Sequence, residues 1–213
     1  MTITIRPARA EDADFIAHTI LLSQRGPLPR GWFDVVLDRP EDEVLSFTRR
    51  LVLARTVSWY HASQFWVAEL DGLPAAALCA MPAAATRESA RAALSEVVQD
   101  MGLSQTERAA MFERGAYAQA CWIQGGAGDW LIEHVACQAA CRGRGLMQPL
   151  IARAVEAGRA AGYANASITF VIGNDAAERC YARAGFRFAE EKRDPQFEAI
   201  TGSPGFRRFA RSI

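Results

Sequence analysis

The sequence predicts a mixed α/β fold in which helices flank a central sheet. An apolar run of strand length, residues 130–137, is followed by a glycine-rich turn and then by a helical apolar pattern over 146–161. A further strand, rich in β-forming residues, is expected over 164–172. The chain has 213 residues, of which 50% are hydrophobic. This length and composition fit one α/β domain with an inserted segment, or at most two small domains.

Proline and glycine mark the element boundaries in the first part of the chain. Pro7 ends an alternating segment, and Pro40 interrupts a helical pattern. The pair Asp71-Gly72 is a strong signal for a tight turn between two strands. The expected elements are a strand over 2–6, a helix from about 10 to 23, one or two helices over 34–56, and a hairpin of strands 65–70 and 73–81.

Residues 83–117 are alanine-rich and predict helices, with a break at 102–104. Ser104 or Thr106 is a suitable N-cap for the second of these helices. Near the end of the chain we expect a short helix over 174–185, strands that start at 187 and 206, and a turn over 201–205.

The turn between the central strand and its helix contains two glycines and two arginines. Gly143 and Gly145 can adopt positive φ, and the first free N–H groups of the following helix carry a partial positive charge. Arg142 and Arg144 add two permanent charges, which suits a pyrophosphate. An anion site and an ordinary strand-to-helix turn both remain open interpretations of this segment.

The helix over 174–185 has both of its ends marked. Asn174 is a good N-cap and Gly185 is a natural left-handed stop. Asn174, Ala177 and Tyr181 fall on one helix face, where the small Ala177 leaves room for a ligand. The hydroxyl of Tyr181 is then available as a proton donor, although half-buried packing is the alternative role for this side chain.

Together these two segments resemble the GNAT superfamily of acyl-CoA-dependent N-acyltransferases. In that family the first segment reads Arg or Gln, two residues, Gly, one residue, Gly or Ala, and the segment from Arg142 to Met147 matches it until Met147 replaces the last small residue. The second family segment reads Asn, two residues, Ala, three residues, Tyr, three residues, Gly-Phe, and residues 174–186 match it throughout.

The resemblance implies a mostly antiparallel sheet with one splayed parallel pair of strands, and acetyl-CoA as co-substrate without a metal. It also implies a single acetyltransferase domain over 1–213, in which the helices at about 83–117 are an insertion that tunes the substrate or the oligomer. The CoA contacts that it implies are Val135, Ala136, Cys137, Arg142, Gly143, Arg144, Gly145, Leu146, Met147, Asn174, Ala177 and Tyr181.

Strand alternation predicts that Glu133, Val135 and Cys137 face one side of the sheet and His134 the other. Glu133 lies nine residues before Arg142, where members of the family often place an acidic residue or a histidine. The resemblance therefore implies that Glu133 receives the amine proton through water, with His134 as the alternative base, and that Tyr181 is the general acid. A salt bridge at the sheet surface is the structural alternative for Glu133.

Trp32 and Phe33 follow the first helix, in the segment that commonly forms one wall of the acceptor pocket in this family. Core packing is the alternative for either aromatic side chain. The acceptor is expected to be a small-molecule amine or a peptide amine, and its identity stays open. Two other functions are also open: a catalytically silent acyl-CoA sensor, and an interaction module that uses the helices of 83–117.

Composition narrows the remaining function classes. The chain has 24 basic and 24 acidic residues, whereas domains that coat nucleic acids usually carry a basic excess. Its five cysteines are dispersed without metal-like spacing, and no apolar run reaches membrane-spanning length. We therefore expect a cytoplasmic protein with no nucleic-acid partner, no membrane partner and no metal, and a homodimer is a possible assembly.

Overall fold

The computed structural model describes residues 1–123, 125–126 and 128–213. Within these residues the strands are β1 (Ile3–Pro7), β2 (Phe65–Leu70), β3 (Leu73–Pro82), β4 (Asp129–Cys137), β5 (Asn165–Val171), β6 (Arg187–Arg193) and β7 (Gly205–Ser212). They form one sheet in the order β1-β2-β3-β4-β5-β7-β6. Neighbouring strands are antiparallel except β4 and β5, which are parallel. The predicted mixed, mostly antiparallel sheet is therefore confirmed.

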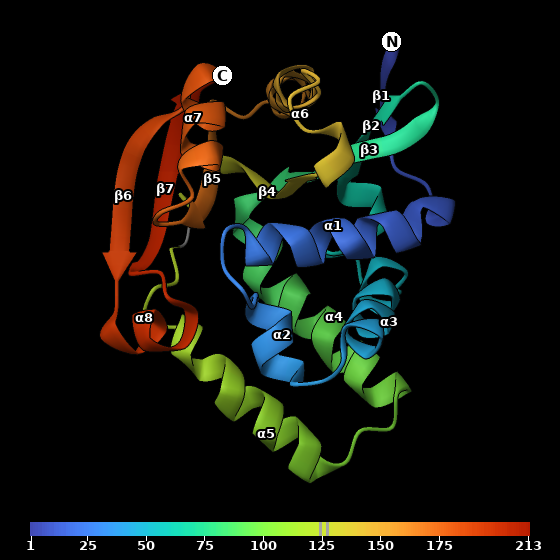
Figure 1. Cartoon of the computed structure of the whole chain (residues 1–213), viewed down its shortest axis with the longest axis vertical. Coiled ribbons are helices and arrows are strands. Elements are labelled where there is room, and N and C mark those ends of the chain that lie inside the picture. The colour runs from blue at the N-terminus through green and yellow to red at the C-terminus, as the bar shows by residue number, and fades with distance from the viewer. Residues whose placement is uncertain (124, 127) are drawn as a thin grey trace.

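Helices cover both faces of this sheet (Figure 1). They are α1 (Ala13–Arg25), α2 (Trp32–Leu37), α3 (Glu41–Val52), α4 (Thr86–Asp100), α5 (Gln105–Gly115), α6 (Met147–Ala160), α7 (Asp175–Arg183) and α8 (Pro195–Thr201). One apolar cluster joins α1 to α4 with one sheet face, and a second joins α6 and α7 with the other face. In Figure 1, α6 lies above β4, beside β1 to β3, and α1 to α5 lie below the sheet.

The element pattern follows the sequence closely, with one helix that the sequence prediction missed. The hairpin turn is formed by Asp71 and Gly72, which both have positive φ (51° and 84°). Helix α8 occupies a segment where only the turn after it was expected. Its signal is Asp194-Pro195: the Asp194 carboxylate accepts hydrogen bonds from the first-turn N–H groups, and proline occupies the first helical position.

Close packing holds α6 against the sheet. A Cβ at Gly158 would lie 2.5 Å from the Trp130 ring, so only glycine allows this approach. The indole Nε1 of Trp130 in turn donates a hydrogen bond to the carbonyl of Ala154, 2.9 Å away. These contacts fix the axis of α6 and thereby the position of its N-terminus, which follows the glycine-rich turn.

The parallel pair β4 and β5 separates part of the way along its length. Its pairing runs from Asp129 opposite Asn165 to Ile132 opposite Ile168, although the two strands continue to Cys137 and Val171. The splay that the family resemblance implies is therefore present. It opens a gap in the sheet at the level of Glu133 and His134.

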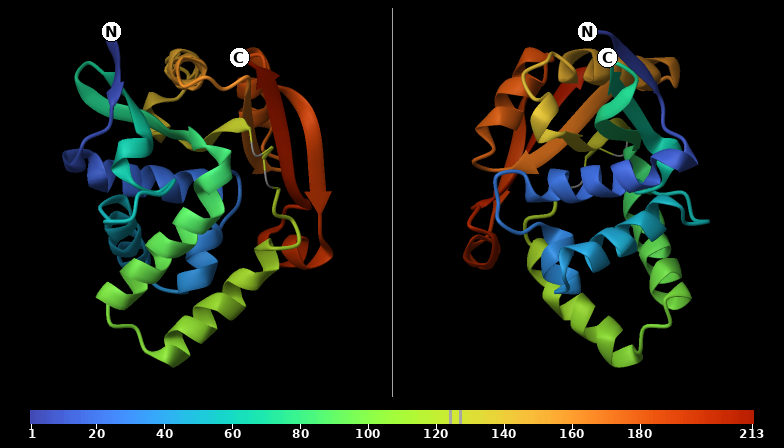
Figure 2. Two further views of the ribbon diagram at one scale, coloured as in Figure 1. Left: turned by 180° about the vertical axis from the view of Figure 1, so that it is seen from behind. Right: turned by 45° about the vertical axis from the view of Figure 1, so that its right-hand side comes forward.

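The segment 83–117 is helical, as the sequence predicts. Ser104 caps α5: its hydroxyl accepts a hydrogen bond from the Glu107 N–H, while the Glu107 carboxylate accepts one from the Ser104 N–H. Figure 2 shows α4 and α5 as the two arms of a V that opens toward the sheet. A second glycine-rich segment, residues 125–128, precedes β4 and predicts a flexible turn, but it lies partly outside the described residues.

Candidate active site

A bulge in β4 decides which side chains face the site. Ala136 pairs with Ala77 and Glu133 pairs with Cys79, so His134 and Val135 together lie opposite one residue of β3. His134 has a φ of 51°, in the left-handed region that residues other than glycine rarely adopt. The extra residue shifts the in-and-out alternation of the side chains that follow it.

The bulge corrects the alternation predicted for this strand. His134 contacts the ring of Tyr60, and the charge of Glu133 acts on the same Tyr60, which belongs to the apolar cluster under α1 to α4. Val135 and Cys137 pack instead against the cluster around α6, on the opposite face of the sheet. The prediction that Glu133, Val135 and Cys137 share one side is wrong. It also follows that Glu133 and His134 face the same side.

A cavity of about 900 Å³ begins where β4 and β5 diverge. It extends past the ends of α1 and α7 and between α4 and α5. The predicted site residues that line it are Trp32, Glu133, His134, Val135, Ala136, Cys137, Arg142, Met147, Asn174, Ala177 and Tyr181. Residues far apart in the sequence therefore meet around one space.

Glu133 is a carboxyl group held in an apolar environment. Burial raises its pKa from the ordinary value of 4.5 to about 8. The salt bridge considered as its structural alternative is not formed with any described residue. A carboxyl group with a pKa near neutrality can both accept and release a proton at physiological pH.

His134 is buried among aromatic rings. Its ring centroid lies 5.7 Å from that of Trp59, 5.4 Å from that of Tyr60 and 6.2 Å from that of Phe65. Burial lowers its pKa to about 3, so the imidazole is neutral. This makes it a much weaker base than Glu133.

One hydrogen bond assigns the tautomer of His134. The Ser23 hydroxyl donates to the carbonyl of Ile20 (2.7 Å) and lies 3.3 Å from Nδ1 of His134. Because the single hydroxyl proton is used on Ile20, Ser23 accepts from His134, and Nδ1 carries the imidazole proton. Nε2 then holds the lone pair, and within the described part of the chain it has no hydrogen-bond partner.

Tyr181 is 5% exposed and lies on the face of α7 that borders the cavity. Its ring makes an edge-on contact with Phe170 of β5, with centroids 5.4 Å apart. Burial, with smaller contributions from Cys180 and Glu133, raises the pKa of its hydroxyl well above the usual value. The hydroxyl therefore keeps its proton throughout the physiological range.

The glycine-rich turn has the conformation that its residues favour. Gly143 and Gly145 have φ of 76° and 78°, and no atom lies within 4 Å of a Cβ built at either position. No described side chain caps the N-terminus of α6. Leu146 is buried in the core, so only its main chain can contact a ligand.

Helix α7 also borders the cavity. The Asn174 side chain caps the helix by accepting a hydrogen bond from the Ala177 N–H at 3.2 Å. The loop after α1 comes close at this point, since a Cβ at Gly26 would lie 3.1 Å from Nδ2 of Asn174. The three residues of the family segment, Asn174, Ala177 and Tyr181, all border the cavity as the helix spacing predicts.

The structure separates the two aromatic residues expected at the acceptor wall. Trp32 borders the cavity, whereas Phe33 is fully buried and packs against Phe47 and Tyr60. Phe33 thus takes the core role considered as its alternative, because the first turn of α2 directs consecutive side chains to different sides. Sequence analysis missed Trp59, Tyr60 and Trp122, which also line the cavity. The pair Trp59-Tyr60 between a helix and a strand was the available signal.

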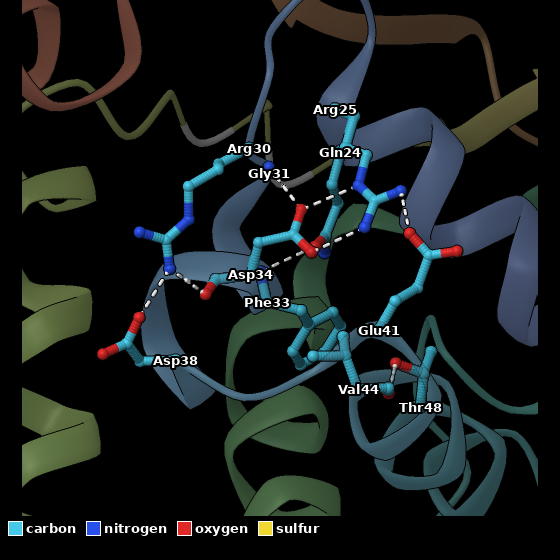
Figure 3. A network of polar contacts seen from close by, with 10 residues as sticks. All are labelled: Gln24, Arg25, Arg30, Gly31, Phe33, Asp34, Asp38, Glu41, Val44 and Thr48. Atoms are coloured by element: carbon cyan, nitrogen blue, oxygen red, sulfur yellow. Dashed lines mark hydrogen bonds and ion pairs between the residues drawn. The ribbon is translucent and has the colours of Figure 1, made fainter.

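An ion-pair network fixes the helix that carries Trp32 (Figure 3). The Asp34 carboxylate accepts two hydrogen bonds from Arg25, both at 2.8 Å, and one from the Gly31 N–H at 2.7 Å. Arg25 also pairs with Glu41 at the start of α3. Burial opposes ionisation of Asp34, but Arg25 and the Gly31 N–H outweigh it and hold the pKa of Asp34 below its usual value.

The cysteines near the cavity are poorly suited to covalent catalysis. Burial raises the thiol pKa of Cys137 and of Cys180, which lowers the fraction of nucleophilic thiolate. Among the described residues, no three His, Cys, Asp or Glu side chains are grouped to hold a metal ion. None of the helices in the described ranges is long and apolar enough to cross a membrane.

The sequence was compared with protein-family models and with curated proteins. The acetyltransferase (GNAT) family model matches residues 32–186, and the chain therefore belongs to this family of acyl-transferring enzymes. No curated protein matches the chain.

Solved structures of acetyltransferases share the fold over the whole chain. One acetyltransferase crystal structure is 18% identical, with 99% of each chain covered and a TM-score of 0.70. An N-acetyltransferase from Staphylococcus aureus Mu50 is 19% identical, with 98% of this chain and 100% of that chain covered and a TM-score of 0.68. The polyamine N-acetyltransferase of Drosophila melanogaster, which forms N-acetylagmatine, is 17% identical, with 100% of both chains covered and a TM-score of 0.56.

Proposed function

We propose that this enzyme transfers an acetyl group from acetyl-CoA to a primary amine, with Glu133 receiving the amine proton through water and Tyr181 protonating the departing thiolate. The observation that carries the proposal is that both side chains border one cavity at the point where β4 and β5 separate. The pKa of about 8 at Glu133 supports its role, because a general base works best when its pKa is close to the operating pH. The low pKa of His134 argues against the alternative base.

The residues around the α6 N-terminus fit the pyrophosphate of CoA. Positive φ at Gly143 and Gly145 and the open space around them leave the main chain accessible. The first-turn N–H groups of α6 are free of side-chain caps from described residues, and Arg142 borders the cavity beside them. In this proposal the pantetheine arm lies in the gap between the strands, close to Val135, Ala136 and Cys137.

The transfer follows from these positions. Acetyl-CoA supplies an activated acyl group, and the neutral amine attacks its thioester carbon directly. Main-chain N–H groups near Cys137 stabilise the charge that develops on the carbonyl oxygen. Glu133 takes the proton that the amine loses, and the Tyr181 hydroxyl donates a proton to the sulfur as the C–S bond breaks.

We further propose that residues 1–213 act as a single acetyltransferase domain in which the helices of 83–117 are an insertion. The continuity of the cavity from β4 to α4 and α5 supports this view, because the insertion then forms one wall of the acceptor site.

Calorimetric titration of acetyl-CoA tests the cofactor part of the proposal. The wild type is compared with Gly145→Ala and Gly145→Glu, both of which place a Cβ at a φ of 78° where no neighbour lies within 4 Å. The alanine variant therefore measures the backbone strain alone, and the glutamate variant adds a charge. Binding that survives in the alanine variant and is lost in the glutamate variant supports a pyrophosphate site. No binding to the wild type contradicts the proposal.

Steady-state kinetics test the two catalytic roles. We expect Glu133→Gln to lower kcat/KM by a factor of about 100 to 10,000 and Tyr181→Phe to lower kcat with little change in the affinity for acetyl-CoA. In the wild type, activity should rise with pH through a step near the Glu133 pKa of about 8, and Glu133→Gln should lack that step. CoA binding without turnover of any amine would instead favour a silent sensor.

A further inference from the structure

The acceptor side of the cavity has an unbalanced charge. Glu133 is the sole acidic residue among the described residues that line the cavity, whereas five of them are arginines. These are Arg30, Arg87, Arg91, Arg108 and Arg142. Two of these arginines have another partner or position: Arg30 pairs with Asp38 at 2.8 Å, and Arg142 belongs to the glycine-rich turn.

The other three arginines, Arg87, Arg91 and Arg108, have no carboxylate partner within the described residues. Arg87 donates to the side-chain oxygen of Gln119 (3.1 Å) and Arg108 to the carbonyl of Leu103 (2.8 Å), both of which are uncharged. Arg87 and Arg91 are one turn apart on the cavity-facing side of α4. Their positive charges therefore remain available to a ligand.

A row of aromatic rings separates Glu133 from Arg87. His134, next to Glu133 in the chain, contacts Trp59 with ring centroids 5.7 Å apart, and Trp59 contacts Trp122 at 5.4 Å. The main-chain N–H of Trp122 donates to the carbonyl of Gln119, the same residue whose side chain accepts from Arg87. A ligand that reaches from Glu133 to Arg87 thus passes two indole rings.

Helices α4 and α5, the two arms of the V in Figure 2, both line this part of the cavity. Its walls carry Leu94, Val98, Met111 and Phe112, and Phe112 is 82% exposed. An apolar surface with an arginine rim suits an occupant that is apolar in its middle and negatively charged at its end.

We propose that the acceptor is a primary amine whose apolar body ends in a carboxylate several bonds away from the amine, as in an ω-amino acid or the N-terminus of a short apolar peptide. This inference rests on the proposed acetyl transfer. The amine lies at Glu133, the body lies along Trp59 and Trp122, and the carboxylate lies at Arg87 and Arg91. A polyamine is a poor substrate in this arrangement, because its second ammonium group would meet like charges.

Three amines of the same length test the proposal: ω-aminooctanoate, octylamine and the α,ω-diamine of octane. They differ only in a tail that is anionic, neutral or cationic. We expect kcat/KM to be highest for the aminocarboxylate and lowest for the diamine, with about a tenfold step for the carboxylate over the neutral tail. Equal or better turnover of the diamine overturns the inference while the proposed acetyl transfer stands.

Variants at the arginines identify the source of the preference. The double variant Arg87→Gln, Arg91→Gln should lose the preference for the carboxylate but keep the turnover of octylamine. The double variant Arg87→Glu, Arg91→Glu should reverse the order and favour the diamine. Arg50→Gln is the matched control, since Arg50 is exposed on α3 and does not line the cavity. An unchanged order in both double variants overturns the inference.

Equilibrium binding tests the inference without requiring that any amine be acetylated. The three amines are titrated into wild type and into the double glutamate variant in the presence of saturating CoA. Tighter binding of the aminocarboxylate to the wild type alone supports the inference even if no amine is acetylated. Equal affinities for the three tails overturn it, whatever the activity.

Discussion

The conformation of one residue, His134, determines which groups face the cavity. Its positive φ places His134 beside Glu133 and moves Val135 and Cys137 to the α6 side of the sheet. The sequence predicts the strand that carries Glu133 and His134, but it does not predict which side chains share a face with Glu133. A two-residue period describes an unbroken strand, and no residue in this stretch is a glycine that would signal a bulge.

The positive φ of His134 predicts that substitution by glycine destabilises the protein no more than substitution by alanine, the reverse of the usual order in a strand. In an ordinary strand, glycine is less stable than alanine by roughly 0.5 to 1 kcal/mol. At a φ of 51°, alanine carries the steric penalty and glycine does not, so His134→Gly should be at least as stable as His134→Ala. Thermal unfolding of the two variants measures the difference. A clearly more stable alanine variant would mean that the bulge is absent.

The raised pKa of Glu133 predicts a pH dependence of stability. The unfolded chain loses the Glu133 proton near the ordinary value of 4.5, and the folded protein holds it up to about 8. The folded state therefore binds more protons in this window, and the free energy of unfolding falls as pH rises through it.

Glu133→Gln removes this titration, so the stability of the variant relative to the wild type should rise between these two pH values and then level off. Denaturant unfolding at several pH values measures the difference, which we expect to reach a few kcal/mol at most. A difference that does not change with pH would contradict an apolar environment for this carboxyl group.

At the scale of elements, the position of α2 depends on the network around Asp34. This residue joins the end of α1 through Arg25, the start of α2 through Gly31 and, through Arg25, the start of α3 at Glu41. Trp32 stands in the first turn of α2 and faces the cavity. One buried ion pair therefore positions an aromatic wall of the candidate site.

Two aspartates of the α2 region provide a matched comparison. The side chains of Asp34 and Arg25 are 11% and 23% exposed, whereas those of Asp38 and Arg30 are 62% and 50% exposed. We expect Asp34→Asn to cost about 2 to 4 kcal/mol, because the largely buried Arg25 loses its bidentate partner and keeps only the more exposed Glu41. Asp38→Asn should cost less than about 1 kcal/mol. Chemical denaturation gives both values, and equal costs would refute the role assigned to the network.

The elements themselves could be predicted well, because their signals are local. Caps such as Asn174 and Ser104, and turn residues such as Gly72, mark element ends in the sequence and act there in the structure. Helix α8 was missed although Asp194 and Pro195 give a local signal of the same kind. The roles of Trp59 and Trp122 could not be predicted, since these residues meet only through tertiary packing.

At the scale of the whole molecule, β4 and β5 divide the sheet into two parts, one with β1 to β3 and the other with β7 and β6. The cavity follows this division and continues into the helices of 83–117. Sequence motifs locate the two strands, but the distance over which they stay paired depends on packing from both parts. The extent of the cavity could therefore not be predicted from the sequence.

Hydrogen exchange in the presence of acetyl-CoA tests this arrangement. A ligand at a hundredfold excess over its Kd stabilises the protein by about 2.7 kcal/mol. We expect the largest slowing of exchange in the part of β4 after Ile132, where the pairing with β5 has ended, and in the first turn of α6. Slowing confined to the helices of 83–117 would place the ligand elsewhere.

The parallel pairing of β4 with β5 also bears on how the chain folds. The antiparallel contacts of β2 with β3 and of β6 with β7 join strands that are close in sequence, whereas β4 meets β5 only after the crossover through α6. Loop closure makes contacts between strands that are far apart in sequence slow to form. We therefore expect the β2–β3 and β6–β7 pairs to form first and β4, which is far along the chain from both β3 and β5, to join late. The binding cavity would then be the last region of the native structure to appear during folding.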